Sequence, residues 1–353
     1  MTIPYHYMQL PREVIVGNGV LNRITEVTKR LNLKETALII SGTKSYEIAG
    51  KKVYDLLEQA GMNPHGLLVE TTTPKDLETI EKQITNLKPQ ILIGIGGGTI
   101  IDATKVNSGK QNIPFISIPT IVSHDGIASP LASLKDIDKP YSILSQAPLA
   151  IIADIDIISS APWRSVISGC GDVIAKFTSV KDWELAHKEK NEYYGEYAAS
   201  LALMSAQLIT ANASSIQPEN IGGLRILLEA LISCGVAMSI AGSSRPCSGS
   251  EHMFSHALDI INPNRAMHGE QVGIGTIISA FLHGTNWQQI RDTLKQIGAP
   301  TTAKELGIKD ENIIKAIELA PTIRPERYTI LHKQQHLNYE TCQTIAKKTK
   351  IID

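Results

Sequence analysis

Short apolar runs alternate with polar and helical segments in the first part of the chain. We expect buried β-strands where these runs are bounded by turn residues, at 37–41, 66–70, 91–98, 115–119 and 149–155. The run at 12–17 ends near Gly17 and Gly19 and predicts an edge hairpin. Thr73 before Pro74 has the pattern of a helix N-cap followed by proline at the first helical position. Strands that alternate with helices predict a parallel sheet covered by helices on both faces.

The pattern changes near residue 160, where the short strand signals stop. Longer segments with helical spacing follow, at about 165–186, 193–215, 221–241, 250–260, 270–283 and 287–297. A chain of 353 residues also exceeds the usual size of one hydrophobic core. The sequence therefore predicts an α/β domain over 1–160 and a helical domain over 161–353.

Composition excludes several classes of partner. Hydrophobic residues make up 42% of the chain and charged residues 20%, which is typical of an ordered globular protein. The formal net charge of -1 gives no electrostatic support for binding nucleic acid or an anionic membrane. The longest apolar stretch, about 226–241, is interrupted by Glu229, Ser233 and Gly235, so we expect no integral membrane segment. Four cysteines without CxxC spacing indicate reduced thiols in a cytoplasmic protein.

A glycine-rich turn follows the strand expected at 91–98. Gly96, Gly97 and Gly98 remove side chains where a pyrophosphate would approach the backbone, and the next helix offers free N–H groups and its positive dipole end. Asp102 is placed to cap or orient that helix. The usual G-x-G-x-x-G pattern with an acidic residue about twenty positions later is not met. A simple tight turn therefore remains an alternative to a dinucleotide site.

A second polar loop, 118–130, follows the next strand. Loops at the carboxyl ends of strands are where α/β sheets bind ligands. The polar residues of this loop are Thr120, Ser123, His124, Asp125 and Ser129. Turn formation explains such residues equally well, but two neighbouring candidate loops support each other.

Four residues of the helical half have the character of metal-site residues. His252 and His256 are four positions apart, so a helix places them on one face, and His268 opens the segment HGEQVG. Asp172 lies upstream in GCGDVIAK. Two imidazoles and a carboxylate, with one coordination position open, suit a catalytic ion such as zinc. The alternatives are histidines satisfied inside a helical core and an aspartate that caps a helix.

Five segments in this order resemble one enzyme family. They are GGGTIIDATK (96–105), PTIVSHDGIASP (119–130), GCGDVIAK (169–176), SSRPCSGSEHMFSHALD (243–259) and MHGEQVGIG (267–275). The chain is similar over nearly its whole length to the sn-glycerol-1-phosphate dehydrogenases. These belong with iron-containing alcohol dehydrogenases, glycerol dehydrogenases and dehydroquinate synthases. The resemblance implies a Rossmann-like parallel-sheet domain, an all-helical C-terminal domain and an active-site cleft between them.

The resemblance also implies roles for single residues. It implies metal ligands at Asp172, His252 and His268, with Asp172 also on the substrate side. His256 and Asp125 match catalytic and substrate-contacting positions. The pyrophosphate loop would be formed by Gly96, Gly97, Gly98, Thr99 and Asp102, and the nicotinamide contacts by Thr120, Ser123 and Ser129.

The implied reaction is the reversible reduction of dihydroxyacetone phosphate to sn-glycerol 1-phosphate by NADH or NADPH. This step supplies the glycerophosphate backbone of archaeal ether phospholipids. The family usually holds Zn²⁺, although a two-histidine, one-aspartate set also accepts Ni²⁺ or Fe²⁺. The family forms homo-oligomers, so we expect one here. The alternative is an NAD-dependent glycerol dehydrogenase, which has the same ligands but no phosphate to recognise.

Several supporting residues have two interpretations. Glu251 and Glu270 lie beside ligands and are either hydrogen-bond partners of the imidazoles or surface residues. Candidates for the substrate phosphate are Arg245 and Arg265, and more weakly Lys105 and Lys176, with structural salt bridges as the alternative. At the ribose-reading position, Gly42, Thr43 and Lys44 offer no acidic side chain. This absence predicts that both NADH and NADPH are accepted.

Overall fold

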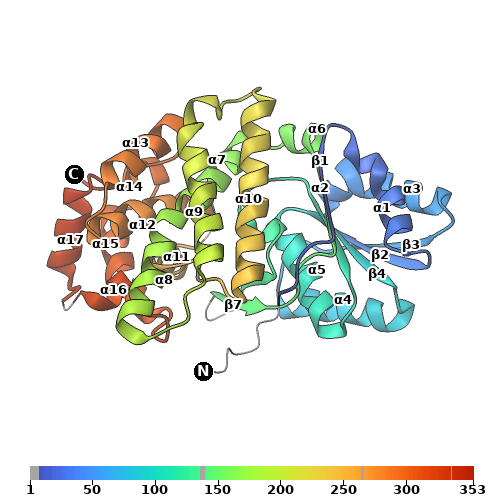
Figure 1. The fold of residues 1–353 in the computed structure, drawn as a ribbon, viewed down its shortest axis with the longest axis horizontal. Helices are drawn as coiled ribbons and strands as arrows, with labels where there is room; N and C mark the ends of the chain where they lie inside the picture. Colours follow the sequence, from blue (N-terminus) through green and yellow to red (C-terminus); the bar gives the residue numbers. More distant parts are fainter. Residues whose placement is uncertain (1–7, 136–139, 264–265, 335) are drawn as a thin grey trace. The chain divides into compact units, whose positions relative to one another are not determined.

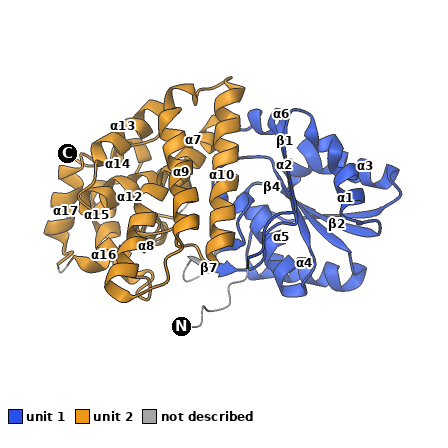
Figure 2. Ribbon diagram, viewed as in Figure 1, with its two compact units in different colours: residues 1–162 blue, residues 163–353 orange. Residues whose placement is uncertain are grey.

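A computed structural model describes residues 8–135, 140–263, 266–334 and 336–353. The chain forms two compact units, Met1–Pro162 and Trp163–Asp353 (Figure 2). The first unit contains a parallel sheet with covering helices, and the described part of the second is helical. The predicted fold class, an α/β region followed by an all-helical region, is confirmed.

The first unit is built on a six-stranded parallel sheet (Figure 1). Its strands, in spatial order, are β1 (Glu13–Gly17), β8 (Ala150–Asp154), β5 (Phe115–Pro119), β4 (Ile91–Gly96), β2 (Thr36–Ser41) and β3 (Asn63–Leu68). All five neighbouring pairs are parallel, so the carboxyl ends of the strands meet at one edge of the sheet. The loops that follow β2, β3, β4 and β5 therefore lie along that edge.

Helices cover this sheet and complete its core. They are α1 (Ile24–Arg30), α2 (Thr43–Ser45), α3 (Lys51–Gln59), α4 (Pro74–Leu87), α5 (Gly98–Gln111) and α6 (Ile155–Ser159). Ile39, Ile93 and Ile116 of the strands are buried together with Ile24 and Val53 of α1 and α3. A separate pair, α4 and α5, packs together and contacts β2, β4 and β5. The predicted N-cap is present, because the Thr73 side chain accepts a hydrogen bond from the Asp76 N–H.

One local prediction in this unit was wrong, and one pair of strands was missed. The segment at 12–17 forms an edge strand, but it pairs in parallel with β8 and makes no hairpin. The reason lies after Gly17: Gly19 adopts a positive φ of 64° and leads into a 3-10 helix, Val20–Arg23. The N–H groups of Gly19 and Leu21 donate to the carboxylate of Asp154. An antiparallel hairpin, β6 (Leu131–Lys135) with β7 (Pro140–Leu144), was not predicted, because this segment has no long apolar run.

The second unit is an assembly of helices. The longer ones are α7 (Trp163–Ile174), α8 (Lys176–Lys190), α9 (Glu196–Ala211), α10 (Ile221–Ala241), α11 (Ser250–Ile261), α12 (His268–Leu282), α13 (Trp287–Ile297), α15 (Asp310–Leu319) and α17 (Tyr339–Lys348). Short helices are α14 (Ala303–Leu306) and α16 (Ile330–Lys333). The single helix predicted at 165–186 is two helices. The Ala175 carbonyl accepts hydrogen bonds from the Thr178 N–H (2.9 Å) and hydroxyl (3.0 Å), which tightens the turn between them.

Two expectations drawn from composition can be compared with the structure. The apolar stretch expected at 226–241 is part of α10, which is long and apolar enough to cross a membrane by length and composition alone. However, 67% of its most apolar window is buried inside the structure, as in the core helix of a globular protein. All four cysteines are buried free thiols, in agreement with the absence of CxxC spacing.

Candidate functional site

Three helices of the second unit bring the predicted metal ligands together. Asp172 lies on α7, His252 on α11, and His268 is the first residue of α12. One ligand atom from each residue lies within 4.8 Å of the others. His252 Nε2 is 3.5 Å from Asp172 Oδ1, and the two imidazole centroids are 5.1 Å apart. A carboxylate and two imidazoles at this spacing can bind one divalent cation.

Glycines allow the helices to approach closely enough for this arrangement. A Cβ atom at Gly171 would lie 2.1 Å from the carbonyl oxygen of Gly269, and one at Gly269 would lie 1.7 Å from the carbonyl oxygen of Ser168. The two backbones therefore touch at the residues that precede Asp172 and follow His268. A larger residue at either glycine would separate the two ligands.

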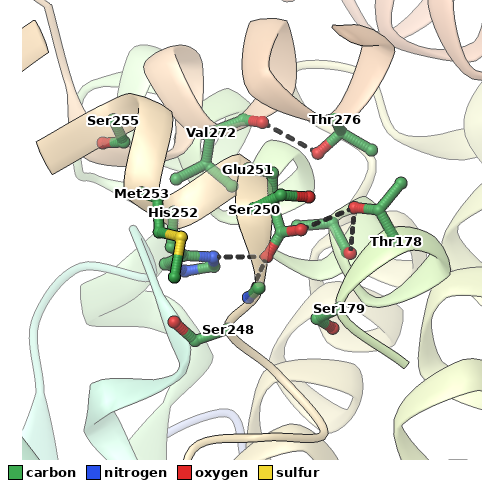
Figure 3. A network of polar contacts seen from close by, with 12 residues as sticks. Thr178, Ser179, Ser248, Ser250, Glu251, His252, Met253, Ser255, Val272 and Thr276 are labelled. Atoms are coloured by element: carbon green, nitrogen blue, oxygen red, sulfur yellow. Dashed lines mark hydrogen bonds and ion pairs between the residues drawn. The ribbon is translucent and has the colours of Figure 1, made fainter. Parts of the chain in front are cut away.

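The side chain of His252 is oriented by a buried carboxylate. His252 Nδ1 lies 2.8 Å from Glu251 Oε1 (Figure 3). This contact leaves His252 Nε2 facing Asp172 Oδ1, which is 3.5 Å away. Glu251 is itself fixed, because it also accepts hydrogen bonds from the Gly249 N–H (2.5 Å) and the Thr178 hydroxyl (2.7 Å). Its side chain is fully buried. Glu251 is thus the partner that a metal-ligating imidazole requires, and the interpretation as a surface residue is wrong.

A polar chain orients His268 in a similar way. Its Nδ1 lies 3.4 Å from Ser255 Oγ, and the Ser255 hydroxyl donates to Gln271 Oε1 at 2.7 Å. The Gln271 amide in turn donates to Asp259 Oδ1 at 2.9 Å. Because the serine proton is directed to Gln271, its oxygen can accept from His268 Nδ1. This leaves Nε2 as the atom that would bind a metal ion.

The electrostatics of the cluster favour a cation. Burial would raise the pKa of Asp172, but Lys176, 3.3 Å away, and His252 hold it well below its ordinary value. Burial would lower the pKa of His252, but the Asp172 and Glu251 carboxylates raise it. The carboxylate is thus ionised, and carboxylates face both sides of the His252 ring. An ionised carboxylate and two oriented imidazoles fit a divalent metal ion such as zinc.

The two candidate cofactor loops of the first unit lie against each other. Gly96 has a φ of 159°, and a Cβ atom at Gly98 would lie 1.8 Å from His124 Nε2. The Thr120 N–H donates to the Gly96 carbonyl oxygen at 3.0 Å. Thr99 is exposed in the first turn of α5. The structure thus places the glycine turn and the loop at 118–130 together at the carboxyl edge of the sheet.

The other predicted cofactor residues have contacts within the same unit. Ser123 and Ser129 are buried, and the Ser129 hydroxyl donates to the Leu131 carbonyl oxygen at 3.0 Å. Asp125 is half-buried at the start of a short 3-10 helix, Asp125–Ile127. Asp102 is buried as well. Their contacts with a dinucleotide or substrate stay predictions.

Comparison with known proteins gives the family. Residues 15–162 match the family described as iron-containing alcohol dehydrogenase. The chain is 52% identical over 347 residues to glycerol-1-phosphate dehydrogenase (NAD(P)+) of Methanosarcina mazei, covering 98% of this chain and 97% of that one. It is 50% identical to the Thermococcus sibiricus protein of the same name, covering 100% of both. The chain belongs to the glycerol-1-phosphate dehydrogenase family.

Solved structures with less similar sequences share the fold. Glycerol dehydrogenase from Schizosaccharomyces pombe has a TM-score of 0.81 at 22% identity, and the match covers 98% of this chain and 91% of that one. The NADH-dependent butanol dehydrogenase A from Thermotoga maritima has a TM-score of 0.72 at 16% identity, with 97% and 99% covered. At these identities the likeness shows the fold alone.

Most of the residues that were candidates for binding the substrate phosphate form ion pairs or hydrogen bonds inside the protein. Arg245 forms a two-pronged ion pair with Glu192 (Nε to Oε1, 2.6 Å) and donates to the Tyr328 carbonyl oxygen at 2.9 Å. The salt-bridge alternative is therefore correct for Arg245. Lys176 pairs with Asp172, and Lys105 is fully buried against backbone carbonyls and Asp102. Arg265 lies outside the described residues.

Among the described residues, Glu270 bonds to Arg164 and to the backbone, and not to an imidazole. Its carboxylate accepts two hydrogen bonds from Arg164, at 2.6 and 2.7 Å, and one from the Met267 N–H at 2.8 Å. The last contact caps the N-terminus of α12, where His268 is the first residue. Glu270 therefore fixes the start of the helix that carries His268, the predicted ligand.

Two arginines near His256 were missed in the sequence. Burial, together with the charges of His252, Arg324 and Arg327, lowers the pKa of His256 to about 3. Arg327 donates to the Ser248 carbonyl oxygen at 2.6 Å, just before α11. The sequence feature that could have indicated them is the spacing of the two arginines, three positions apart in IRPER (323–327). This pair lies after the last segment with a clear helical pattern.

We expect Glu251→Gln to weaken metal binding by about 10- to 100-fold, because an amide orients and polarises His252 less than a carboxylate. Zinc affinity is measured by competition with a chromophoric chelator. The matched control is Glu229→Gln on α10, whose side chain is 52% exposed and should leave the affinity unchanged. Equal zinc affinity in Glu251→Gln and the wild type would contradict the role of Glu251.

Proposed function

We propose that the chain catalyses the reversible reduction of dihydroxyacetone phosphate to sn-glycerol 1-phosphate with NADH or NADPH. The observation that carries this proposal is the convergence of Asp172, His252 and His268 in a chain about half identical to glycerol-1-phosphate dehydrogenases over their whole length. NAD(P) dependence comes from the names of those relatives. Zinc as the resident metal, and a role in archaeal ether-lipid synthesis, belong to the same proposal.

The metal-binding residues would act on the substrate carbonyl. A divalent cation held by Asp172, His252 and His268 would supply Lewis-acid polarisation and stabilise the negative charge that develops as hydride arrives. Glu251 keeps the His252 ring in place during this step. His256 is a neutral imidazole at neutral pH, because its pKa is lowered to about 3. We therefore assign it a hydrogen-bonding role toward the substrate, and it is not a cationic acid.

The substrate phosphate requires a cationic side chain that forms few ion pairs and hydrogen bonds within the protein. Within the described chain, the only ion pair of Arg324 is with Glu326 at 3.6 Å, and the Glu326 side chain is 71% exposed. The pKa of Arg327 is lowered to about 9 by burial and by the neighbouring Arg324 and Arg245. Positive charge thus accumulates beside His256. We assign the phosphate to Arg324, since a guanidinium can bind it bidentately.

The test is NADH oxidation by the zinc-loaded protein with dihydroxyacetone phosphate, with and without chelator. We expect turnover that the chelator removes, and a product that an enzyme specific for sn-glycerol 3-phosphate does not accept. Arg324→Gln should raise the KM for dihydroxyacetone phosphate by about tenfold or more, since a hydrogen bond to a charged group contributes about 1.5–3 kcal/mol. The variant should leave the NADH affinity unchanged.

A parallel assay with NAD and glycerol distinguishes the alternative, a glycerol dehydrogenase. NAD reduction with glycerol, without turnover of the phosphate ester, would assign the chain to a glycerol dehydrogenase activity. A chelator-resistant reaction would contradict the metal assignment. An unchanged KM in Arg324→Gln would contradict only the phosphate assignment.

A further inference from the structure

A carboxylate lies at the carboxyl end of β2, where the sequence predicted no acidic side chain. Glu70 follows β3, and its Oε1 accepts hydrogen bonds from the Thr43 N–H and the Thr43 hydroxyl, both at 2.7 Å. A Cβ atom at Gly42 would lie 3.3 Å from Glu70 Oε2. The prediction from Gly42, Thr43 and Lys44 was therefore incomplete, because an acidic side chain reaches this position from the neighbouring strand.

The sheet register places this carboxylate next to the glycine turn. β2 lies between β3 and β4, and Ser41 is paired with both Leu68 and Ile95. Glu70 is two residues past Leu68, and Gly96 is one residue past Ile95. The end of β2 is also tied to the glycine turn, because the Ser45 hydroxyl donates to the Ile95 carbonyl oxygen at 2.8 Å.

In dinucleotide-binding sheets, the pyrophosphate lies at a glycine turn and an acidic side chain nearby binds the adenosine ribose. In this chain the glycine turn follows β4, and the adjacent strand end is that of β2. Glu70 is the acidic side chain at that end. The position therefore suits the ribose of a dinucleotide whose pyrophosphate lies on Gly96–Gly98.

The carboxylate is charged and has acceptor capacity left. Hydrogen bonds from the Thr43 hydroxyl and N–H lower the pKa of Glu70 below its ordinary value, so it is ionised at neutral pH. In the described chain both of these bonds use Oε1, and no lysine or arginine forms an ion pair with Glu70. The side chain is exposed, so a ligand can reach Oε2.

We propose that Glu70 selects NADH over NADPH in this chain. Its Oε2 accepts a hydrogen bond from the ribose 2′-hydroxyl of NADH, and its negative charge repels the 2′-phosphate of NADPH. Thr43 positions the carboxylate for this contact. The inference rests on the proposed function, since it takes the ligand to be a nicotinamide dinucleotide, and it replaces the expectation that both cofactors are used equally.

The test compares the Kd values of NADH and NADPH for the substrate-free protein, measured by calorimetry or nicotinamide fluorescence. We expect the wild type to bind NADH more tightly. Glu70→Gln should reduce the ratio of the two Kd values by about tenfold or more, because like charges in contact are costly. The amide oxygen can still accept from Thr43, so the local fold is kept. Glu58→Gln, at an exposed site on α3, should leave the ratio unchanged.

The dependence of the NADH preference on ionic strength provides a second test. Because Glu70 is exposed, the preference of the wild type should weaken at high ionic strength, whereas that of Glu70→Gln should change little. A Kd ratio in Glu70→Gln equal to that of the wild type would overturn the inference alone. A wild type that binds neither dinucleotide would overturn the proposed function together with it.

Discussion

Replacing His252 by alanine should reduce turnover of dihydroxyacetone phosphate by about 10³-fold or more, because metal-derived charge stabilisation contributes several kcal/mol and each 1.36 kcal/mol is a factor of ten. His252 supplies one of only two imidazoles in the cluster, and its Nε2 lies 3.5 Å from Asp172 Oδ1. Asp172 and His268 alone leave a site with two protein ligands, which is one fewer than catalytic zinc sites use.

The measurement combines steady-state kinetics with the zinc content of the purified protein. The matched control is His336→Ala, since His336 is exposed and lies outside the cluster. Thermal unfolding in the presence of chelator checks that the fold of His252→Ala is intact without metal. Substantial activity in a folded, zinc-depleted His252→Ala protein would show that His252 is not a catalytic ligand.

The strands and the helix that carries His252 and His256 could be predicted because their signals are local. The runs at 37–41 and 115–119 are strands within one residue of the expected bounds. The spacing of His252 and His256 places both on one helix. The meeting of Asp172 with His252 and His268, however, was suggested by resemblance, since no pattern within one helix reports how three helices pack.

The supporting contacts could be predicted only as one of two alternatives, because they join residues far apart in the chain or run against helix geometry. Neighbouring residues on a helix do not normally face each other, yet Glu251 contacts His252 because it lies in the first turn of α11 and binds Gly249. Arg245 was a candidate for the phosphate or for a structural salt bridge, and its partner Glu192, 53 residues away, decides for the salt bridge. Both interpretations required the tertiary structure.

The acidic side chain proposed for cofactor selection could not be found from the sequence alone either. The acidic residue was sought directly after the strand at 37–41, but it comes from the end of the next strand, 27 residues beyond Thr43. Only the register between β2 and β3 brings Glu70 to that position. The sequence thus predicted the end of β2 as the ribose-reading position, and the sheet register gives the acidic side chain that we propose for it.

Replacing Lys105 by methionine should destabilise the protein by about 3–5 kcal/mol, because removing one partner leaves a buried charge uncompensated. Lys105 Nζ donates to Asp102 Oδ1 (2.9 Å) and to the carbonyl oxygens of Gly126 (2.8 Å) and Leu131 (2.6 Å). Its side chain is fully buried. The ammonium group thus joins the helix after the glycine turn to both ends of the segment that contains Ser129.

Urea unfolding measures the free energy, and NADH titration measures the expected loss of cofactor affinity as the loop loosens. The control Lys110→Met changes an exposed lysine of the same helix and should stay within about 0.5 kcal/mol of the wild type. A Lys105→Met protein as stable as this control would contradict the role of Lys105.

The double variant Asp102→Asn/Lys105→Met separates the charge from the packing. The asparagine oxygen can still accept from the Ser133 N–H, which now donates to Asp102 Oδ2 at 3.0 Å. No unpaired charge remains in this variant, so we expect it to be more stable than Lys105→Met alone, although it carries one more substitution. If the double variant is instead less stable by the sum of the single effects, the two residues act independently. The effect of Lys105→Met would then come from the lost bonds to the Gly126 and Leu131 carbonyl oxygens and not from the ion pair within α5.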